Sequence, residues 1–405
     1  MLDDFGQRIR DIILSEMDLS RELSDEEICD LIGSVVSREA RDRPMTIKDR
    51  AELERTIFNS LRKLDVLQEL VDDRDVTEIM VNGPNDIFYE KAGRIKRFKG
   101  HFSSEEKLED VIQQIVGRHN RVVNQASPIV DTRLSDGSRV NIVLNPISIG
   151  GSAVSIRKFP EHPMSMERLV EIEALSPEVA RLLQILTQAK YNIFISGGTG
   201  SGKTTFLNAL SQYIPDDERI ITIEDSAELQ LLGAKNIVRL ETRNANTDGV
   251  TPITIRDLIR TALRMRPDRI IVGECRGAEA LDMLQAMNTG HDGSLSTGHA
   301  NSPHDIISRI ETMVLQGQDF PLNAIRQQIA SGIDIIVQLG RLRDKSRRVL
   351  EVSEVDGFMD GEIVLHTLYR FEETGVLDSG RIQGFLKKAG TLCHTDKLMA
   401  AGLSV

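Results

Sequence analysis

The fold of this chain is decided by the stretch Gly197-Gly198-Thr199-Gly200-Ser201-Gly202-Lys203-Thr204. The stretch fits the pattern G-x-x-x-x-G-K-[ST] and stands between an apolar run at residues 192–196 and a helical pattern at residues 204–210. Its glycines allow backbone N–H groups to converge on phosphates, and the start of the following helix adds positive potential. We therefore predict a loop that binds a nucleotide, with Lys203 at the β- and γ-phosphates and the Thr204 hydroxyl on Mg²⁺. The alternative, a glycine-rich turn without a ligand, is disfavoured by the strand and helix that flank it.

Helices and strands alternate around this loop. Buried β-branched runs at residues 220–223 and 269–273 predict two further strands. Ser176 and Thr254 are typical helix caps, and Pro267 is expected to end the helix that Thr254 opens. Continuous apolar strands between helices indicate an α/β fold with a mostly parallel sheet that is covered on both faces.

The chain is expected to divide into three parts. Residues 1–60 are rich in charge and predict a helical extension, and residues 61–160 mix strands and helices. Residues 165–405 form the α/β domain around the loop. Prolines break any regular element at residues 160–163, so we interpret that stretch as a linker.

Local patterns place elements within these parts. Ser24 followed by Glu27 is typical of a capping box, and Ser103 is expected to cap another helix. Residues 349–355 and 362–371 predict a β-hairpin, which gives the α/β domain an antiparallel edge. Further strands are predicted at residues 76–81, 140–144 and 153–159.

Composition limits the classes of function. The chain has 405 residues, 40% of them apolar and 28% charged, which is ordinary for a globular protein. The 50 basic and 62 acidic residues leave a net charge of −12, which weighs against a nucleic-acid binder. Cys29, Cys275 and Cys393 are scattered, which weighs against a disulfide framework and a zinc site and favours a reducing compartment.

Membrane and export signals are also missing from the sequence pattern. No apolar run approaches the roughly 18–20 residues that span a bilayer. The start Met1-Leu2-Asp3-Asp4 is acidic where a signal peptide would be basic. We expect a cytosolic protein whose membrane contact is peripheral or made through a partner.

A glutamate follows one of the predicted strands. Glu274 comes directly after residues 269–273, at the sheet edge where ligands bind in open α/β folds. Gly273 stands where an aspartate that holds the metal is usual, so we interpret Glu274 as the group that orients the attacking water. A solvated helix cap is the alternative interpretation.

A second acidic cluster follows the strand at residues 220–223. It contains Glu224, Asp225 and Glu228. Adjacent carboxylates repel unless a cation or water lies among them. The cluster is therefore a candidate for the metal shell that Gly273 cannot supply, and an exposed loop is the alternative.

Residues 291–299 combine two histidines, three hydroxyls and two glycines. The spacing of His291 and His299 matches no common zinc pattern. A loop histidine is usually solvated or hydrogen-bonded, which is one interpretation. The other is a phosphate sensor close to the nucleotide.

Together these motifs resemble the type II/IV secretion ATPase superfamily, and within it the CpaF-type ATPases of Tad/Flp pilus assembly. The likeness covers residues 61–371 and rests on an ordered set of motifs, because the glycine loop alone is unspecific. In that family a glycine before the catalytic glutamate is normal. The matching segments are an aspartate box at residues 220–229, a Walker B segment at 272–277, a histidine box at 289–302, and N-terminal segments at 76–84, 131–140 and 155–159.

The resemblance implies a hexameric ring of two-domain subunits. A PAS-like α/β domain at residues 61–160, preceded by the helical extension, would be hinged to a RecA-like P-loop ATPase domain at residues 165–405. The nucleotide would lie between them. Arg139 and Arg157 match the arginines that the first domain supplies to the phosphates, and Arg276 is a further candidate. Without the resemblance each arginine is interpreted as a surface cation.

The residues and the resemblance together define a candidate site. Catalytic roles are expected for Glu274, Lys203, Arg157, Arg139, His299 and Glu228. Nucleotide contacts are expected from Gly198, Thr199, Gly200, Ser201, Gly202, Lys203, Thr204, Thr205, Arg276 and His291. Mg²⁺, bound with the substrate ATP, is expected at Thr204, Glu224, Asp225 and Glu274. Cys275 is interpreted as a small buried hydrophobe without a chemical role.

The expected function is an ATP-driven motor that powers pilus assembly or type II secretion. Its expected partners are copies of itself and the platform proteins of a pilus or secretion system, at the cytoplasmic face of the inner membrane. No nucleic-acid partner and no direct membrane span are expected. Three alternatives stay open: a type IV secretion ATPase, a RecA-like nucleic-acid motor, and a nucleotide-regulated scaffold without turnover. The acidic charge and the absence of Trp weigh against a strand-binding channel, and Glu274 weighs against the scaffold.

Overall fold

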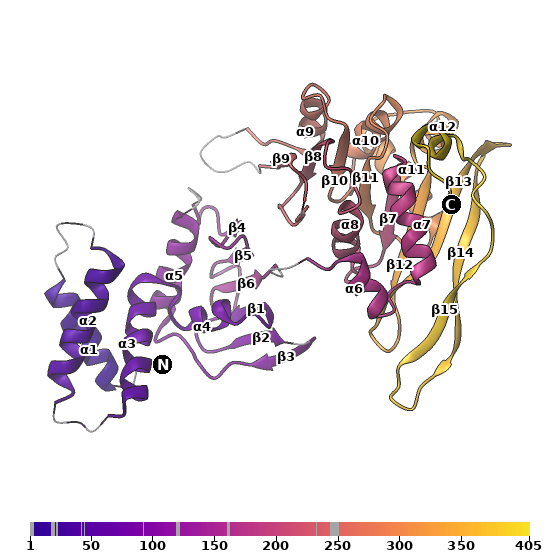
Figure 1. The fold of residues 1–405 in the computed structure, drawn as a ribbon. Coiled ribbons are helices and arrows are strands. Elements are labelled where there is room, and N and C mark those ends of the chain that lie inside the picture. Colours follow the sequence, from indigo (N-terminus) through magenta and orange to yellow (C-terminus); the bar gives the residue numbers. More distant parts are fainter. Residues whose placement is uncertain are drawn as a thin grey trace. The chain divides into compact units, whose positions relative to one another are not determined.

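The chain forms two compact units, unit 1 (Met1–Glu161) and unit 2 (His162–Val405) (Figure 1). The computed structural model describes residues 4–17, 21, 23–41, 43, 45–91, 93–118, 122–159, 163–231, 233–243 and 251–405. Residues 160–162 of the expected linker lie outside the described residues.

Three helices open unit 1. They are α1 (Asp4–Glu16), α2 (Asp25–Glu39) and α3 (Ile47–Arg62). Ser24 caps α2 as predicted, because its hydroxyl accepts from the Glu27 N–H while the Glu27 carboxylate accepts from the Ser24 N–H. The apolar stripes of the three helices meet in a separate core that includes Ile9, Ile13, Ile28, Ile32 and Ile57.

A six-stranded sheet forms the rest of unit 1. The short helices η1 (Asp65–Leu67) and α4 (Gln68–Asp72) lead into it. Its order is β3-β2-β1-β6-β5-β4, and every neighbouring pair is antiparallel. The strands are β1 (Val76–Asn82), β2 (Ile87–Lys91), β3 (Arg94–Arg97), β4 (Ile129–Arg133), β5 (Arg139–Val143) and β6 (Ala153–Arg157).

Helix α5 (Glu105–Gly117) packs on this sheet with its apolar stripe, which belongs to the same core cluster as the strands. Its N-cap is Ser104, one residue later than predicted from Ser103. The Ser104 hydroxyl accepts from the Lys107 N–H at 3.2 Å. Two adjacent serines offer the same capping chemistry, and the position of the buried stripe selects the second.

Unit 2 is built on a nine-stranded sheet with the order β15-β14-β13-β12-β7-β11-β10-β8-β9. The six strands from β12 to β9 are parallel, and β13, β14 and β15 add an antiparallel edge, as predicted. The parallel strands are β7 (Ile193–Gly197), β8 (Arg219–Glu224), β9 (Asn236–Glu241), β10 (Arg269–Val272), β11 (Leu295–Gly298) and β12 (Ile335–Arg341). The antiparallel strands are β13 (Arg347–Met359), β14 (Glu362–Val376) and β15 (Ile382–Lys388).

Helices cover both faces of this sheet, because its central strands are apolar on both faces. Along β7, Ile193 and Ile195 enter one core cluster and Phe194 enters the other. The first cluster includes side chains of α6 (Met166–Glu171), α7 (Pro177–Gln188), α8 (Lys203–Ser211) and α13 (Asp396–Ala401). The second includes side chains of α9 (Ile255–Ala262), α10 (Glu279–Asn288), α11 (Pro303–Gly317) and α12 (Leu322–Gly332).

Two details of unit 2 differ from the predictions. Helix α9 ends at Ala262 rather than at Pro267, and the intervening turn includes Arg266 at a positive φ of 54°. The predicted hairpin continues well past residue 371, since β14 runs to Val376 and β15 and α13 follow. In the described parts of the chain, no helix has the length and apolar character required to cross a membrane.

Candidate active site

The predicted phosphate loop joins the buried strand β7 to helix α8. Gly202 is the N-cap of α8 and has a φ of 94°, a left-handed conformation that a side chain would strain. The helix begins at Lys203, so its free backbone N–H groups and positive end open onto the loop. The loop therefore has the geometry of an anion-binding site.

Lys203 is buried within this loop, with 8% of its surface exposed. Its ammonium donates to the carbonyl oxygens of Gly197 at 3.0 Å and Gly198 at 3.2 Å. Burial lowers the pKa of Lys203, and nearby Glu274 opposes that shift. A bound phosphate would supply the negative charge that this desolvated cation lacks.

Hydrogen bonds fix the backbone on either side of Glu274. The Gly273 N–H donates to the Ile223 carbonyl of β8 at 2.9 Å. The Thr297 hydroxyl of β11 donates to the Gly273 carbonyl at 2.8 Å, and the Cys275 N–H donates to the Thr297 carbonyl at 2.8 Å. Both neighbouring strands thus hold Glu274 at the carboxyl edge of the sheet.

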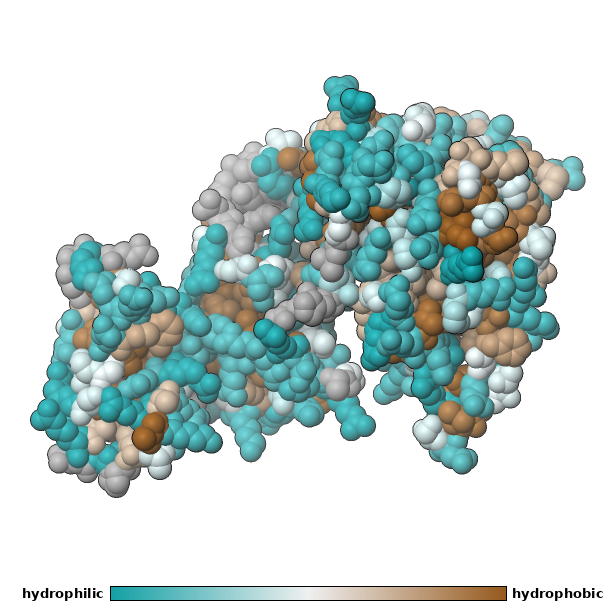
Figure 2. Space-filling view, viewed as in Figure 1, coloured by the Kyte–Doolittle hydropathy of each residue, from teal (hydrophilic) through white to brown (hydrophobic). Residues whose placement is uncertain are grey.

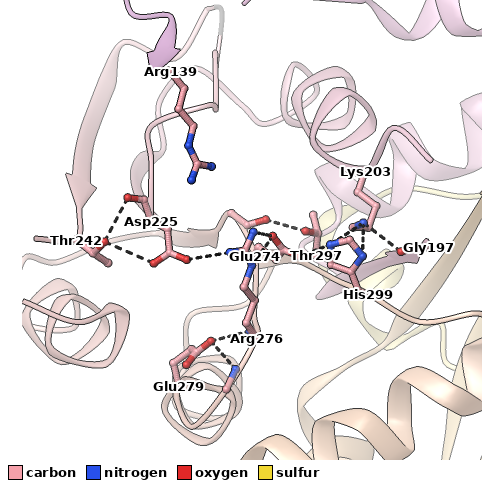
Figure 3. A network of polar contacts seen from close by, with 12 residues as sticks. Arg139, Gly197, Lys203, Asp225, Thr242, Glu274, Arg276, Glu279, Thr297 and His299 are labelled. Carbon is pink, nitrogen blue, oxygen red and sulfur yellow. Dashed lines mark hydrogen bonds and ion pairs between the residues drawn. The ribbon is translucent and has the colours of Figure 1, made fainter. Parts of the chain in front are cut away.

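The side chain of Glu274 belongs to a chain of charged and polar groups (Figure 3). Its Oε1 lies 2.7 Å from His299 Nε2, and its Oε2 accepts from Arg276 Nε at 2.8 Å. Lys203 Nζ lies 3.3 Å from His299 Nδ1 and 3.4 Å from Nε2, so the ammonium is close to both ring nitrogens. Burial and then Lys203 lower the pKa of His299, so the ring is neutral at pH 7. The arrangement brings a carboxylate and a neutral imidazole to the lysine of the phosphate loop.

Glu224 lies at the end of β8 and is 3% exposed. Its Oε1 accepts from the N–H groups of Glu228 and Leu229, each at 2.8 Å, and its buried Oε2 has no partner among the described residues. Burial raises the pKa of Glu224 to about 7. A side chain at position 273 would collide with this carboxylate, because a Cβ there would lie 2.9 Å from Glu224 Cγ. Gly273 is thus required by its neighbour.

The other acidic candidates lie nearer the surface. Asp225 is 3.7 Å from Arg276 Nη1 and also contacts the Thr242 hydroxyl, while Glu228 is half-buried. Over the described residues, no three acidic, histidine or cysteine side chains gather closely enough to hold a metal ion. Glu224, Asp225 and Glu274 therefore do not form a metal cage by themselves.

The structure does not bring His291 to the phosphate loop. His291 precedes β11, whereas His299 follows it, and β11 runs parallel to β7. His291 therefore lies towards the amino ends of the strands, where its Nδ1 is 3.3 Å from the Ala286 carbonyl. Two histidines that flank a short loop were expected to act together, but a four-residue strand separates them.

Arg139 and Arg157 lie in unit 1, directly opposite each other in the β5–β6 ladder. Arg139 is 3.6 Å from Asp131 of β4, and the side chain of Arg157 is exposed. The two arginines are 18 positions apart in the sequence but occupy one point of the sheet.

Sequence reasoning missed Arg347, at the start of β13. Its Nε donates to the Gly200 carbonyl of the phosphate loop at 2.8 Å. Arg347 is distant in sequence and matches no motif, so only the pairing of β13 with β12 could have revealed it. Cys275 is 1% exposed, with its sulfur 3.9 Å from that of Met313, in agreement with the predicted buried hydrophobe.

The phosphate loop with its lysine follows β7, and the glutamate follows β10, which is separated from β7 by β11. This arrangement in a parallel sheet defines the class of P-loop ATPases. The chain belongs to the type II/IV secretion system protein family, which matches residues 60–381. It is an ATP-hydrolysing secretion ATPase, and the predicted α/β fold class with a RecA-like domain is confirmed.

Individual relatives agree with this assignment. The chain is 31% identical over 332 residues to the conjugal transfer protein TrbB of Rhizobium radiobacter, covering 81% of this chain and 98% of the relative. It is 33% identical over 320 residues to the type IV secretion system protein PtlH of Bordetella pertussis, covering 73% and 94%. The crystal structure of the pilus retraction motor PilT with ADP is similar in fold, with a TM-score of 0.55, 22% identity and coverage of 82% and 84%.

Proposed function

We propose that this chain is a hexameric motor of the CpaF type that hydrolyses Mg·ATP at the cytoplasmic face of the inner membrane and drives Tad/Flp pilus assembly. The observation that carries the proposal is the contact chain Lys203–His299–Glu274 at the phosphate loop. It joins the cation that neutralises phosphate to a carboxylate that activates water.

The substrate is ATP with Mg²⁺. The Thr204 hydroxyl at the start of α8 and the unpartnered Glu224 Oε2 are oxygen ligands of the kind that Mg²⁺ or its waters accept. Asp225 and Glu274 are the remaining candidates. When bound, the cation would neutralise charge that develops on the phosphates. Because the acidic side chains do not form a cage, the phosphates themselves complete the metal site in this proposal.

Glu274 orients the attacking water in the proposed mechanism. Arg276 on Oε2 and the backbone bonds around Gly273 hold the carboxylate in place, while Oε1 faces His299. A neutral His299 can accept or donate one hydrogen bond at either nitrogen, so it can report the state of the γ-phosphate to Glu274.

The nucleoside has a place beside the loop. A hollow lined by Ser201, Gly202, Thr205, Phe206 and Ile172 adjoins the start of α8. The hollow has a volume of about 80 Å³, less than a complete ligand pocket, so in this proposal it supplies only an apolar wall beside the base. Arg347, which binds Gly200, also lines it.

Arg139 and Arg157 complete the site when the two units close in the proposed cycle. An arginine presented by another unit stabilises phosphate charge only in the closed state, and so links the nucleotide state to unit position. That motion would pass to a platform protein of the inner membrane.

A type IV secretion ATPase is the second candidate, favoured by the 33% identity to PtlH. Deleting the gene separates the two functions. Loss of surface pili with intact translocation of secreted protein or DNA supports the pilus motor, and the reverse pattern supports the alternative.

The motor itself is tested by steady-state ATPase measurements alongside light-scattering mass. We expect specific activity to rise with protein concentration as rings form. Full activity in a strictly monomeric sample would contradict the ring-dependent mechanism.

A further inference from the structure

A cavity of about 350 Å³ lies in unit 2 near the sheet edge that β14 and β15 form. Its floor consists of Leu182 of α7, Leu368 and Tyr369 of β14, and Leu398 of α13, each at most 5% exposed. Figure 2 shows apolar side chains gathered at the surface near the point where Figure 1 marks the C-terminus. The cavity does not adjoin the phosphate loop, since β13, β12 and β7 lie between.

The size of the cavity argues against a packing defect. Protein interiors contain few voids larger than a water molecule, whose share of liquid volume is about 30 Å³. This cavity opens to solvent, and its volume falls in the range of small-molecule pockets, about 300–1,000 Å³.

The wall formed by residues 390–405 is held in place from below. The Glu354 carboxylate, which is 1% exposed, accepts from the N–H groups of Cys393 at 2.7 Å and His394 at 2.8 Å. The Tyr191 hydroxyl donates to the His394 carbonyl at 2.6 Å. These buried bonds keep the segment from collapsing onto the floor, so the cavity is preformed.

Helix α13 is anchored by a third contact. Lys397 Nζ lies 2.7 Å from Asp334 of β12 and 2.8 Å from Asp292, just before β11. The Tyr369 hydroxyl of the floor donates to Glu178 at 2.7 Å. Lys397 and the Tyr369 hydroxyl are thus already bound within the chain, and the hydroxyls of Thr391, Thr395 and Ser404 also line the cavity.

Lys388 is a charged residue at the rim of the cavity. It lines the cavity and is exposed, and within the described residues it has no acidic partner. Its neighbour Lys387, on the opposite face of β15, pairs with Glu372 at 2.8 Å. An apolar floor with one unpaired cation at its rim is complementary to a molecule that carries an apolar chain and one negative charge.

We propose that this cavity is a binding site for an apolar monoanion, a hydrocarbon chain that ends in a single acid group. The chain occupies the floor between Leu182, Leu368 and Leu398, and the acid group lies at Lys388. A free fatty acid and one chain of an acidic membrane lipid share this chemistry.

Binding is measured on the full chain with decanoate, its neutral analogue decanol, and vesicles of phosphatidylglycerol as probes. The chain has no Trp, so Met399→Trp at the rim, where Met399 is 67% exposed, gives a single fluorescent reporter. Calorimetry on the unmodified chain checks that the reporter does not create the site. We expect saturable binding of one decanoate per chain.

Matched variants locate the ligand. We expect Lys388→Ala to weaken decanoate about threefold to fivefold, as for one exposed ion pair, and to leave decanol unchanged. Lys387→Ala, on the other face of the strand, is expected to leave both unchanged. Leu398→Phe, which fills the floor, is expected to weaken both, and its thermal melting verifies that it folds.

Absence of saturable decanoate binding overturns the proposal, as does equal binding by Leu398→Phe and the unmodified chain, or equal weakening by Lys387→Ala and Lys388→Ala. Binding of decanoate without vesicles assigns the ligand to free fatty acids. Binding of both assigns it to the chains of an acidic membrane, and a response to vesicles without decanoate overturns the proposal.

Discussion

The two units position their functional side chains differently, unit 2 at the edge of a parallel sheet and unit 1 across an antiparallel strand pair. In the parallel sheet of unit 2, the carboxyl ends of β7, β8, β10 and β11 meet at one edge, so Lys203, Glu224, Glu274 and His299 follow four different strands and still lie together. In the antiparallel sheet of unit 1, Arg139 and Arg157 meet across a ladder. Like charges directly opposite each other are destabilising, and Asp131 lies 3.6 Å from Arg139. Unit 2 thus brings its own lysine, glutamate and histidine together at one sheet edge, whereas unit 1 presents two arginines on one strand ladder.

The largest effect is expected at the phosphate loop of unit 2, where ATP is proposed to bind. We expect Lys203→Ala to reduce turnover by a factor of about 10³ or more, because it removes the buried cation that neutralises the phosphates. Steady-state ATPase measurements check this, with the exposed Lys235→Ala as the control. Turnover at the level of the unmodified chain would remove Lys203 from the mechanism.

Glu274→Gln separates binding from chemistry within unit 2. The amide keeps the shape of the side chain but loses the charge that polarises water, so we expect hydrolysis to fall by a factor on the order of 10² or more. Nucleotide affinity, followed by equilibrium binding of a fluorescent ATP analogue, should stay within about tenfold. Loss of affinity in parallel with rate would identify Glu274 as a metal or structural residue instead.

The contribution of unit 1 is tested by Arg157→Ala and Arg139→Ala. Each removes one cation without touching the phosphate loop, so we expect ATPase rates lower by roughly 10-fold to 100-fold and unchanged light-scattering mass. Residues 165–405 alone should bind ATP but hydrolyse it far more slowly than the full chain. Arg94→Ala, exposed on β3 of the same sheet, is the control. Full activity in residues 165–405 would show that unit 1 is dispensable for chemistry.

The smallest effect is one of stability. Burial raises the pKa of Glu224 from the ordinary 4.5 of a glutamate to about 7, so between these pH values the folded state keeps a proton that the unfolded state has lost. The free energy of unfolding therefore falls as pH rises through this window, by up to about 3 kcal/mol. Glu224→Gln does not titrate, so we expect it to be more stable than the unmodified chain at pH 8 and to lose that advantage near pH 4. Urea unfolding at both pH values measures the difference, with Asp225→Asn as the control, and a pH-independent difference would contradict a buried, protonated Glu224.

Sequence reasoning placed Lys203 and Glu274 close together because the carboxyl ends of parallel strands lie at the same edge of a sheet. Lys203 and Glu274 each follow a recognisable apolar strand, and the sheet topology does the rest. His291 lies away from the phosphate loop, because β11 runs across the sheet between the two histidines, and spacing along the chain does not reveal that strand.

What sequence reasoning missed depends on long-range pairing. Arg347 meets Gly200 only because β13 returns beside β12, and residues after 371 carry no motif. The N-cap of α5 is Ser104 rather than Ser103 for a similar reason, since the packing of α5 on the sheet determines which of the two serines caps the helix. Apolar patterns predicted the strands that flank the motifs but not β9, β12 or β15, and contacts between distant segments required the structure.

The close approach of Gly273 to Glu224 limits which residues homologues can carry at these two positions. A side chain at position 273 would lie 2.9 Å from Glu224 Cγ, so an aspartate cannot arise there while the glutamate remains. We therefore expect the two positions to vary together in the family. In a homologue with a side chain at the position of Gly273, we expect a smaller residue in place of Glu224. An alignment of the family in which the two positions vary independently would contradict this steric coupling.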